Sequence, residues 1–253
     1  MSIQESTNQR EFIKLYNEVH KLLSEKFFGK TDKYVSFHRC IDEINKRQGN
    51  YFLSNHIDEL RLINDFRNVI VHRTTNKFYD IAEPSDHIIA ILTTIKTMLS
   101  NPIKISKIID KKQVITFDIN SDLLDVFDHV SKNHISQFPV FNQDKLVGMI
   151  TDNGLAHFVA SHIREQDFLN KNYTIKDVIQ NGETDEYRNS YKILYSELEL
   201  ESVLDEFTDL NHDTHYILVT KSANNQIRSK ADLLDIFTSS DIPEMLQAIE
   251  NNA

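Results

Sequence analysis

The sequence predicts an α+β, multidomain chain in which an all-α first part is followed by a duplicated unit of strands and helices. Apolar residues recur at helical spacing up to Asn101-Pro102, and shorter apolar runs bounded by turn residues follow. The order of elements in this second part occurs twice. We therefore expect a helical bundle at residues 1–101, one repeat at 102–170, a second at 171–242 and a C-terminal tail at 243–253.

The first part is expected to contain about four helices. Apolar residues lie three and four apart from Gln9 to Phe27, and Gly29 ends this helix. Further helices are expected at residues 35–47 and 56–72, and Ser85 is a candidate N-cap for the last one. Because no alternating strand pattern occurs here, we expect a bundle.

The second part is predicted from a repeated order of elements. We expect a strand at 114–117, a helix at 123–130, two strands joined by a turn at 138–141 and 146–151, and a helix at 154–162. Residues 105–110 resemble 175–180 at an offset of 70, while 139–141 resemble 217–219 and 151–159 resemble 229–237 at an offset of 78. The eight-residue difference between these two offsets is assigned to extra residues in the polar stretch 181–189. Such copies usually bury their apolar faces against each other and leave clefts between them.

Composition narrows the class of protein. The chain has 253 residues, of which 40% are hydrophobic and 26% charged, as in soluble globular proteins. It has no apolar run long enough to span a membrane and no signal-peptide pattern at its start. The one cysteine, Cys40, excludes an intramolecular disulfide and lies among apolar residues, so we expect a buried thiol and a cytoplasmic protein.

Charge is distributed unevenly along the chain. The net charge is −10, but residues 1–101 carry 14 Lys and Arg against 13 Asp and Glu, whereas the remainder carries 14 against 25. A uniformly basic nucleic-acid-binding protein is therefore excluded. If RNA is bound, the nearly neutral helical part is where contact is expected.

The residues Ile135–Phe141, a turn and then Leu146–Thr151 resemble the CBS domain, a unit first named from cystathionine β-synthase. The resemblance covers residues 103–165 and, more loosely, 174–242. It implies a tandem pair of βαββα units. It also implies a regulatory adenine nucleotide (AMP, ATP or a cyclic dinucleotide) between the repeats, with no cofactor required.

The family's nucleotide signature is Gly, an apolar residue, any residue, Thr or Ser, two further residues and Asp. The first repeat has Gly148 and Thr151, but Gly154 stands where Asp is expected. The second has Ser229 and Asp232, with Gln226 in place of Gly.

By this resemblance Asp232 would hold the ribose, and Ser229 and Thr151 would contact phosphate. Arg228 and Lys230 would add positive charge beside Ser229. A hydroxyl and free N–H groups at the start of a helix favour a phosphate. The alternative is that both hydroxyls only cap their helices and Asp232 complements the helix dipole.

The predicted helix at 56–72 contains a second group of polar residues. Arg67 shares an apolar strip with Ile63 and Ile70, where a guanidinium needs a polar partner. Asn68 and His72 are one turn apart on an adjoining face.

Arg67 is followed directly by a polar residue, and four residues separate it from His72. This pattern resembles the ribonuclease motif of the HEPN family. Many members of that family are metal-independent endoribonucleases whose active site forms across a homodimer. The resemblance implies that Arg67 holds the scissile phosphate, His72 moves the proton of the attacking 2′-hydroxyl, and Asn68 orients either group. The products would be a 2′,3′-cyclic phosphate and a 5′-hydroxyl.

Two functions have the most support, and a third, an enzyme acting on a small nucleotide in the helical part, has the least. One is a HEPN-like endoribonuclease acting on RNA under control of a nucleotide in the CBS pair, as a homodimer or larger homo-oligomer, with a role in stress response or phage defense by analogy. The other is a non-catalytic, nucleotide-sensing homodimer that regulates a partner protein; His72 would then end its helix and Arg67 would pair with Asp58, Asp65 or a neighbouring helix. No membrane partner is expected. No metal site is expected either, because His212 and His215 lack further ligands at suitable spacing.

Overall fold

The computed structural model describes residues 7–30, 33–46, 51–72, 83–110, 112–133, 135–164, 171–181, 189–208 and 214–252, without the side chains of Tyr51, His72, Asn133 and Asn181. The chain divides into two compact units. The first comprises Met1–Ile103, Glu199–Asp209 and Pro243–Ala253, and the second comprises Lys104–Leu198 and Leu210–Ile242. Each unit is described by itself.

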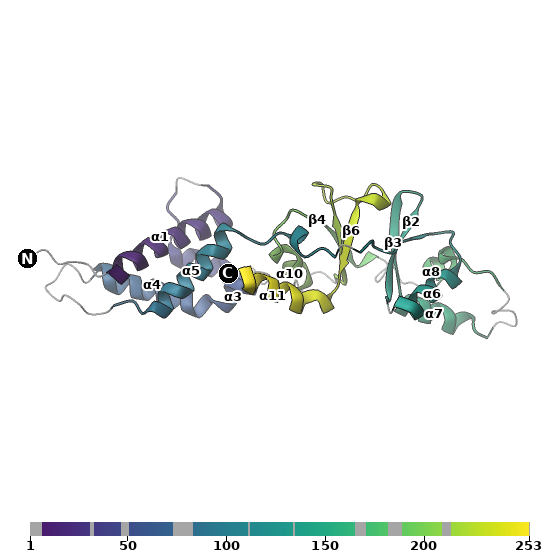
Figure 1. The fold of residues 1–253 in the computed structure, drawn as a ribbon, viewed down its shortest axis with the longest axis horizontal. Coiled ribbons are helices and arrows are strands. Elements are labelled where there is room, and N and C mark those ends of the chain that lie inside the picture. Colours follow the sequence, from purple (N-terminus) through teal and green to yellow (C-terminus); the bar gives the residue numbers. More distant parts are fainter. Residues whose placement is uncertain are drawn as a thin grey trace, which may run out of the picture. The chain divides into compact units, whose positions relative to one another are not determined.

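The first part of the chain is helical, as expected (Figure 1). Its helices are α1 (Thr7–Phe28), α2 (Phe37–Lys46), α3 (Tyr51–Asn55), α4 (Ile57–His72) and α5 (Asp86–Ser100). α1 packs along α5 and α2, and α2 packs against α4. The short α3 was not expected, because its five residues are too few to show a helical period.

The core of this bundle consists of the apolar residues that recur at helical spacing. Phe12, Val19 and Leu23 of α1 are fully buried, and so are Leu60 of α4 and Ile95 of α5. Truncating such a phenylalanine to alanine typically costs about 3–5 kcal/mol of stability, so this strip fixes the bundle.

The predicted ends of two of these helices are confirmed. Gly29 follows α1 at φ +71°, a conformation that only glycine adopts readily, and its N–H donates to the carbonyl of Glu25 at 3.0 Å. Ser85 caps α5, with its hydroxyl accepting from the N–H of Ile88 at 3.4 Å.

The first repeat contains a three-stranded sheet and two helices. Its elements are β1 (Phe117–Asp118), α6 (Leu123–Asn133), β2 (Gln137–Asn142), β3 (Lys145–Thr151) and α7 (Asp152–His162). β1 pairs parallel with β2, and β2 pairs antiparallel with β3.

The second repeat follows the same order. After α8 (Ile175–Asn181) come β4 (Tyr191–Tyr195), α10 (Glu201–Thr208), β5 (Tyr216–Thr220), β6 (Leu233–Phe237) and α11 (Ile242–Asn252). β4 pairs parallel with β5, and β5 pairs antiparallel with β6. Residues 243–253 were expected to form a C-terminal tail, but they are helical as far as Asn252.

Strand pairing aligns the two repeats residue by residue. Val140 pairs with Gly148 and Val219 with Asp235, and a register shift follows directly after each valine. Val219 lies 79 residues after Val140, whereas Asp235 lies 87 residues after Gly148. The second repeat thus carries eight more residues in the connection between its last two strands.

This alignment corrects two predictions. Residues 139–141 were expected to match 217–219, but the strand register matches them with 218–220. Residues 229–237 were expected to repeat the junction of strand and helix at 151–159, but Leu233–Phe237 form strand β6. The helix equivalent to α7 is α11, which starts at Ile242. Thr238, rather than Ser229, follows the last strand as Thr151 ends β3, nine residues later than expected. The longer connection accounts for eight of these residues, and the one-residue change in the match of the preceding strands accounts for the ninth.

The two sheets of the second unit pack on each other. Phe141 and Met149 of the first repeat join Leu218 and Leu233 of the second in one apolar cluster, and all four are buried. In addition, the N–H of Ile105 donates to Leu198 and that of Ile175 donates to Ser121. The segment before each repeat therefore binds the turn after the first strand of the other repeat, which confirms that the copies pair.

Within the described residues, no helix combines the length and apolar character needed to cross a bilayer.

Candidate nucleotide-binding cleft

A cleft of about 540 Å³ lies within the second unit, where residues of both repeats meet. It is lined by the segment before β1, by the start of β2 and by β6: Asp110, Lys112, Gln113, Val114, Ile115, Ile135, Gln137, Asp235 and Ile236. This volume falls within the range of about 300–1,000 Å³ that is usual for small-molecule sites.

The lining combines apolar surface with amide groups. Val114, Ile115 and Ile135 form one apolar part, and Ile236 adds to it from β6. Such surface suits the face of a flat heterocycle. The Gln113 and Gln137 side chains carry donors and acceptors that can recognise the edge of a base.

Carboxylates form the polar end of the cleft. Oδ2 of Asp235 accepts from the N–H of Asp110 at 2.8 Å, and Oδ1 accepts from the N–H of Ile236 at 2.8 Å. Burial raises the pKa of Asp235 despite these hydrogen bonds. Lys112 lies 3.6 Å from the carboxylate of Asp110 and partly neutralises it. Hydroxyl groups of a sugar are therefore better partners here than a chain of phosphates.

The turn from Thr238 to Asp241 follows directly on the β6 residues that line the cleft. Oδ2 of Asp241 accepts from the N–H of Thr238 at 2.6 Å and from its hydroxyl at 3.1 Å. In the strand alignment, Thr238 corresponds to Thr151 and Asp241 to Gly154. The second repeat thus contains Thr, two residues and Asp after its last strand.

These two residues were missed by sequence reasoning. The signal was present, since residues 235–241 contain the spacing expected of the signature, except that Asp235 stands where Gly148 stands in the first repeat. The strand register was needed to identify residues 235–241, rather than the Ser229–Asp232 turn, as the equivalent of residues 148–154 in the first repeat.

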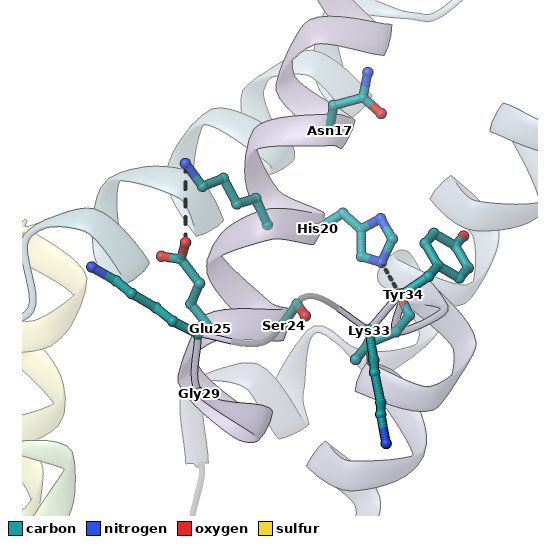
Figure 2. A pocket seen from close by; sticks show the side chains of 10 residues that line it. Asn17, His20, Ser24, Glu25, Gly29, Lys33 and Tyr34 are labelled. Atoms are coloured by element: carbon teal, nitrogen blue, oxygen red, sulfur yellow. Dashed lines mark hydrogen bonds and ion pairs between the residues drawn. The ribbon is translucent and has the colours of Figure 1, made fainter.

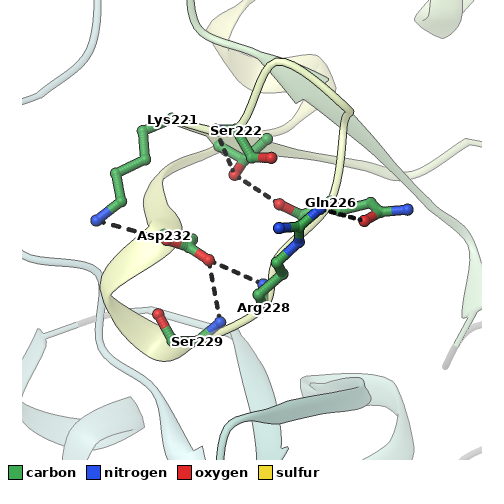
Figure 3. A network of polar contacts seen from close by, with 7 residues as sticks. Lys221, Ser222, Gln226, Arg228, Ser229 and Asp232 are labelled. Atoms are coloured by element: carbon green, nitrogen blue, oxygen red, sulfur yellow. Dashed lines mark hydrogen bonds and ion pairs between the residues drawn. The ribbon is translucent and has the colours of Figure 1, made fainter.

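The predicted residues Ser229 and Asp232 lie in the connection before β6, where they cap a single turn (Figure 3). Oδ2 of Asp232 accepts from the N–H groups of Arg228 at 2.9 Å and Ser229 at 3.1 Å. Its other oxygen lies 3.4 Å from Nζ of Lys221. The hydrogen bond from Arg228, in particular, lowers the pKa of Asp232.

Of the five predicted nucleotide contacts, Arg228, Ser229 and Asp232 lie together in this turn. Thr151 is buried and caps α7, with its hydroxyl accepting from the N–H of Gly154 at 3.1 Å. Lys230 places its ammonium 5.8 Å from the ring centroid of Phe141. None of Thr151, Arg228, Ser229, Lys230 and Asp232 is among the described residues that line the cleft, and neither Thr238 nor Asp241 is.

In the helical unit, α4 brings Arg67 and Asn68 together. The guanidinium lies 5.6 Å from the ring centroid of Tyr16 on α1, and Nη1 donates to Oδ1 of Asn68 at 3.3 Å. The Tyr16 hydroxyl donates to Oδ1 of Asn64 at 2.8 Å, which fixes the ring beneath the cation. The side chain of His72 lies outside the described residues.

Metal ligands do not gather in the described part of the chain. No group of three or more His, Cys, Asp or Glu side chains there is arranged to hold an ion. Of the two histidines considered in the sequence, His212 lies outside the described residues.

The family model of the CBS domain matches residues 105–161, which contain β1, β2 and β3. The second repeat has the same strand order, pairing directions and register shift. The C-terminal part of the chain therefore has the fold of a CBS domain pair, joined to a helical region.

Several solved structures are similar to this part. They include the CBS domain pair of protein MJ0100 in complex with 5′-methylthioadenosine and S-adenosyl-L-methionine, at 21% identity and a TM-score of 0.38, covering 58% of this chain and 98% of that one. CBSX2 in complex with AMP matches at 13% identity and a TM-score of 0.40, covering 58% and 98%. The CBS domain of a bacterial CNNM/CorC family Mg²⁺ transporter in complex with ATP matches at 14% and 0.40, covering 61% and 94%. No curated protein matches the chain.

Proposed function

We propose that this protein senses an adenine nucleotide in the cleft of its CBS pair. The observation that carries the proposal is the position of the cleft: its lining strand β6 leads directly into the Thr238–Asp241 turn. The base would lie against Val114 and Ile115, and Asp241 would accept hydrogen bonds from the ribose hydroxyls. Thr238 would contact the first phosphate.

The same geometry favours a ligand with few phosphates. Asp110 and Asp235 both line the cleft, and Lys112, the one cation among the described lining residues, lies 3.6 Å from Asp110. Like charges at short range are unfavourable, so AMP is expected to bind more tightly than ATP.

A comparison of Asp241→Asn with Asp232→Asn tests this assignment. The side-chain oxygen of asparagine can still accept both capping hydrogen bonds in either turn, so both variants are expected to fold. Calorimetry with AMP should show that Asp241→Asn binds about tenfold to a hundredfold more weakly, as expected for a lost charge-assisted hydrogen bond. Asp232→Asn should bind like the wild type. A loss confined to Asp232→Asn would restore the assignment made from the sequence.

For the helical unit we propose a HEPN-like, metal-independent endoribonuclease. Support comes from Arg67, whose guanidinium is held by Tyr16 and Asn68 while the side chain stays partly exposed. In a homodimer Arg67 would bind the scissile phosphate. The 2′-oxygen would bond to phosphorus as the bond to the 5′-oxygen breaks; His72 would take the 2′-hydroxyl proton, and water would protonate the leaving oxygen.

Incubation of single-stranded RNA with the full chain in EDTA, with and without AMP, tests this activity. Cleavage should leave a 2′,3′-cyclic phosphate and should fall at least about a hundredfold in Arg67→Ala and in His72→Ala. Arg61→Ala, on the same helix and paired with Asp58 at 3.2 Å, is the matched control and should cut normally. Intact RNA both with and without AMP would leave the non-catalytic, nucleotide-sensing homodimer that regulates a partner protein.

Either function needs a connection between sensor and helical bundle, and α10 supplies a candidate. By strand order α10 belongs to the second repeat, yet it is part of the first compact unit. A ligand that binds two arrangements of this helix with different affinity would shift their populations.

A further inference from the structure

The first compact unit contains a mainly apolar cavity of about 350 Å³. Its described lining comes from α3 and the residue after it, from α5 and from α11, and includes Phe52, His56, Thr94, Leu246 and Ile249. The nucleotide cleft and the Arg67 motif share none of these residues.

A larger cavity of the same unit, beside the end of α1, differs in character. Polar side chains form most of its lining, and His20 faces Tyr34 across it (Figure 2). The cavity at α11 is therefore the better candidate for an organic molecule of low polarity, and its volume lies within the usual range of about 300–1,000 Å³.

The walls of the cavity at α11 are aromatic and aliphatic. The rings of Phe52 and His56 meet edge to face, with centroids 4.5 Å apart. On α11, Ile249 is buried and Leu246 is half-buried. An aromatic molecule packs well against such rings and aliphatic side chains. A charged molecule would lose its hydration against this surface, so a neutral one is favoured.

One polar atom of the lining lacks a hydrogen bond. Nδ1 of His56 is shielded from solvent and has no partner. Such atoms are rare in folded proteins, and a small bound molecule is one way in which they are satisfied. The χ2 torsion of histidine is broad, so a rotation of the ring can turn this nitrogen toward a molecule in the cavity. A ligand with a hydrogen-bond donor therefore fits this wall.

Helix α11 forms its side of the cavity as part of the first unit. The Asn252 side chain donates to the carbonyl of Asn101, directly after α5, at 2.8 Å, and Met245 is buried. The helix starts at Ile242, the residue after Asp241. A molecule held between α3, α5 and α11 therefore favours the arrangement in which α11 is packed on the bundle.

We propose that this cavity binds a small, neutral aromatic molecule of the indole or phenol class, whose single hydrogen-bond donor bonds to His56. The ring of the ligand lies against Phe52 and the aliphatic side chains of α11. The binding is independent of the proposed nucleotide function. Only a change of its affinity with AMP, through the link between Asp241 and α11, rests on that function.

Titration of the full chain with indole, followed by the fluorescence of the ligand, tests the proposal. The chain has no tryptophan, so the signal of the indole is separable from that of the protein. Thr94→Phe places a ring in the cavity and should abolish measurable binding. Thr93→Phe is the matched control, because Thr93 is exposed on the same helix, and it should bind indole as the wild type does.

His56→Phe keeps a ring in the wall and removes both nitrogens. It should bind indole about tenfold more weakly than the wild type, as expected for one lost hydrogen bond. N-methylindole has no N–H, so the wild type and His56→Phe should bind it equally. Thermal melting should show that all variants are folded.

Absence of indole binding by the wild type, or equal binding by Thr94→Phe and Thr93→Phe, overturns the proposal. Equal affinity of the wild type and His56→Phe for indole overturns the hydrogen bond to His56. With binding retained, an indole affinity that stays the same at saturating AMP rejects only the link to the nucleotide.

Discussion

At the scale of single residues, Tyr16 connects Arg67 with the core of the helical unit. Its ring is 4% exposed and stacks on Phe37 at 4.6 Å, and its hydroxyl donates to Asn64. Burial raises the pKa of Tyr16 to about 12, although Arg67 acts in the opposite direction. The hydroxyl therefore stays protonated, and remains a donor, at neutral pH.

Tyr16→Phe is expected to cost about 1 kcal/mol of unfolding free energy at pH 8, because the hydrogen bond to Asn64 is lost. Above pH 10 the unfolded chain ionises Tyr16 while the folded chain does not, so the folded state binds more protons. The wild-type advantage should then fall with rising pH, by up to about 1.4 kcal/mol per pH unit. Urea unfolding of both proteins between pH 8 and pH 11 measures this. A pH-independent difference would mean that the hydroxyl is not buried.

At the scale of elements, an ion-pair network links α1 to the segment at α10. Nζ of Lys26 lies 2.7 Å from Glu199 and 3.1 Å from Glu201, and its side chain is 25% exposed. Burial lowers the pKa of Lys26, but the two carboxylates more than offset this and raise it above its usual value. The network is therefore intact at neutral pH. On the alkaline side it is lost as the pH rises through this raised pKa.

Lys26→Met should lower the unfolding free energy by about 1–3 kcal/mol, because Glu199 and Glu201 would be left without their cation in a partly buried place. Lys14→Met, an exposed lysine on the same helix, should change it by less than about 0.5 kcal/mol. Urea denaturation checks both. If AMP control of RNA cleavage passes through α10, Lys26→Met should also reduce it. Equal stabilities of the two variants would contradict the role given to the network.

Local patterns were sufficient to predict elements that depend on nearby residues. The helical spacing of Phe12, Leu15 and Val19 predicted α1, and Ser85 was predicted as a cap because capping acts over three residues. The register of β6 depends instead on its pairing with β5, across a connection whose Ser229–Asp232 turn has the same spacing as Thr238–Asp241. No local signal separates the two turns. The cleft was predicted in kind, but none of its described lining residues was named as a nucleotide contact.

At the scale of the whole molecule, duplication explains where a ligand site can form. Each repeat buries one face of its sheet against the other, and the segments before the repeats bind the opposite copy. The cleft therefore exists only when both copies are folded and paired. Binding of AMP should accordingly stabilise the pair by mass action, by about 2.7 kcal/mol at a concentration one hundred times the dissociation constant.

Titration calorimetry with AMP on the wild type, Gln113→Trp and Leu124→Trp tests the central claim most directly. Gln113 lines the cleft, so an indole there should fill it and abolish measurable heat. Leu124 is 68% exposed on α6 and serves as a control for the added bulk. We expect equal binding by the wild type and Leu124→Trp, and none by Gln113→Trp. Undiminished binding by Gln113→Trp would place the nucleotide elsewhere and contradict the account.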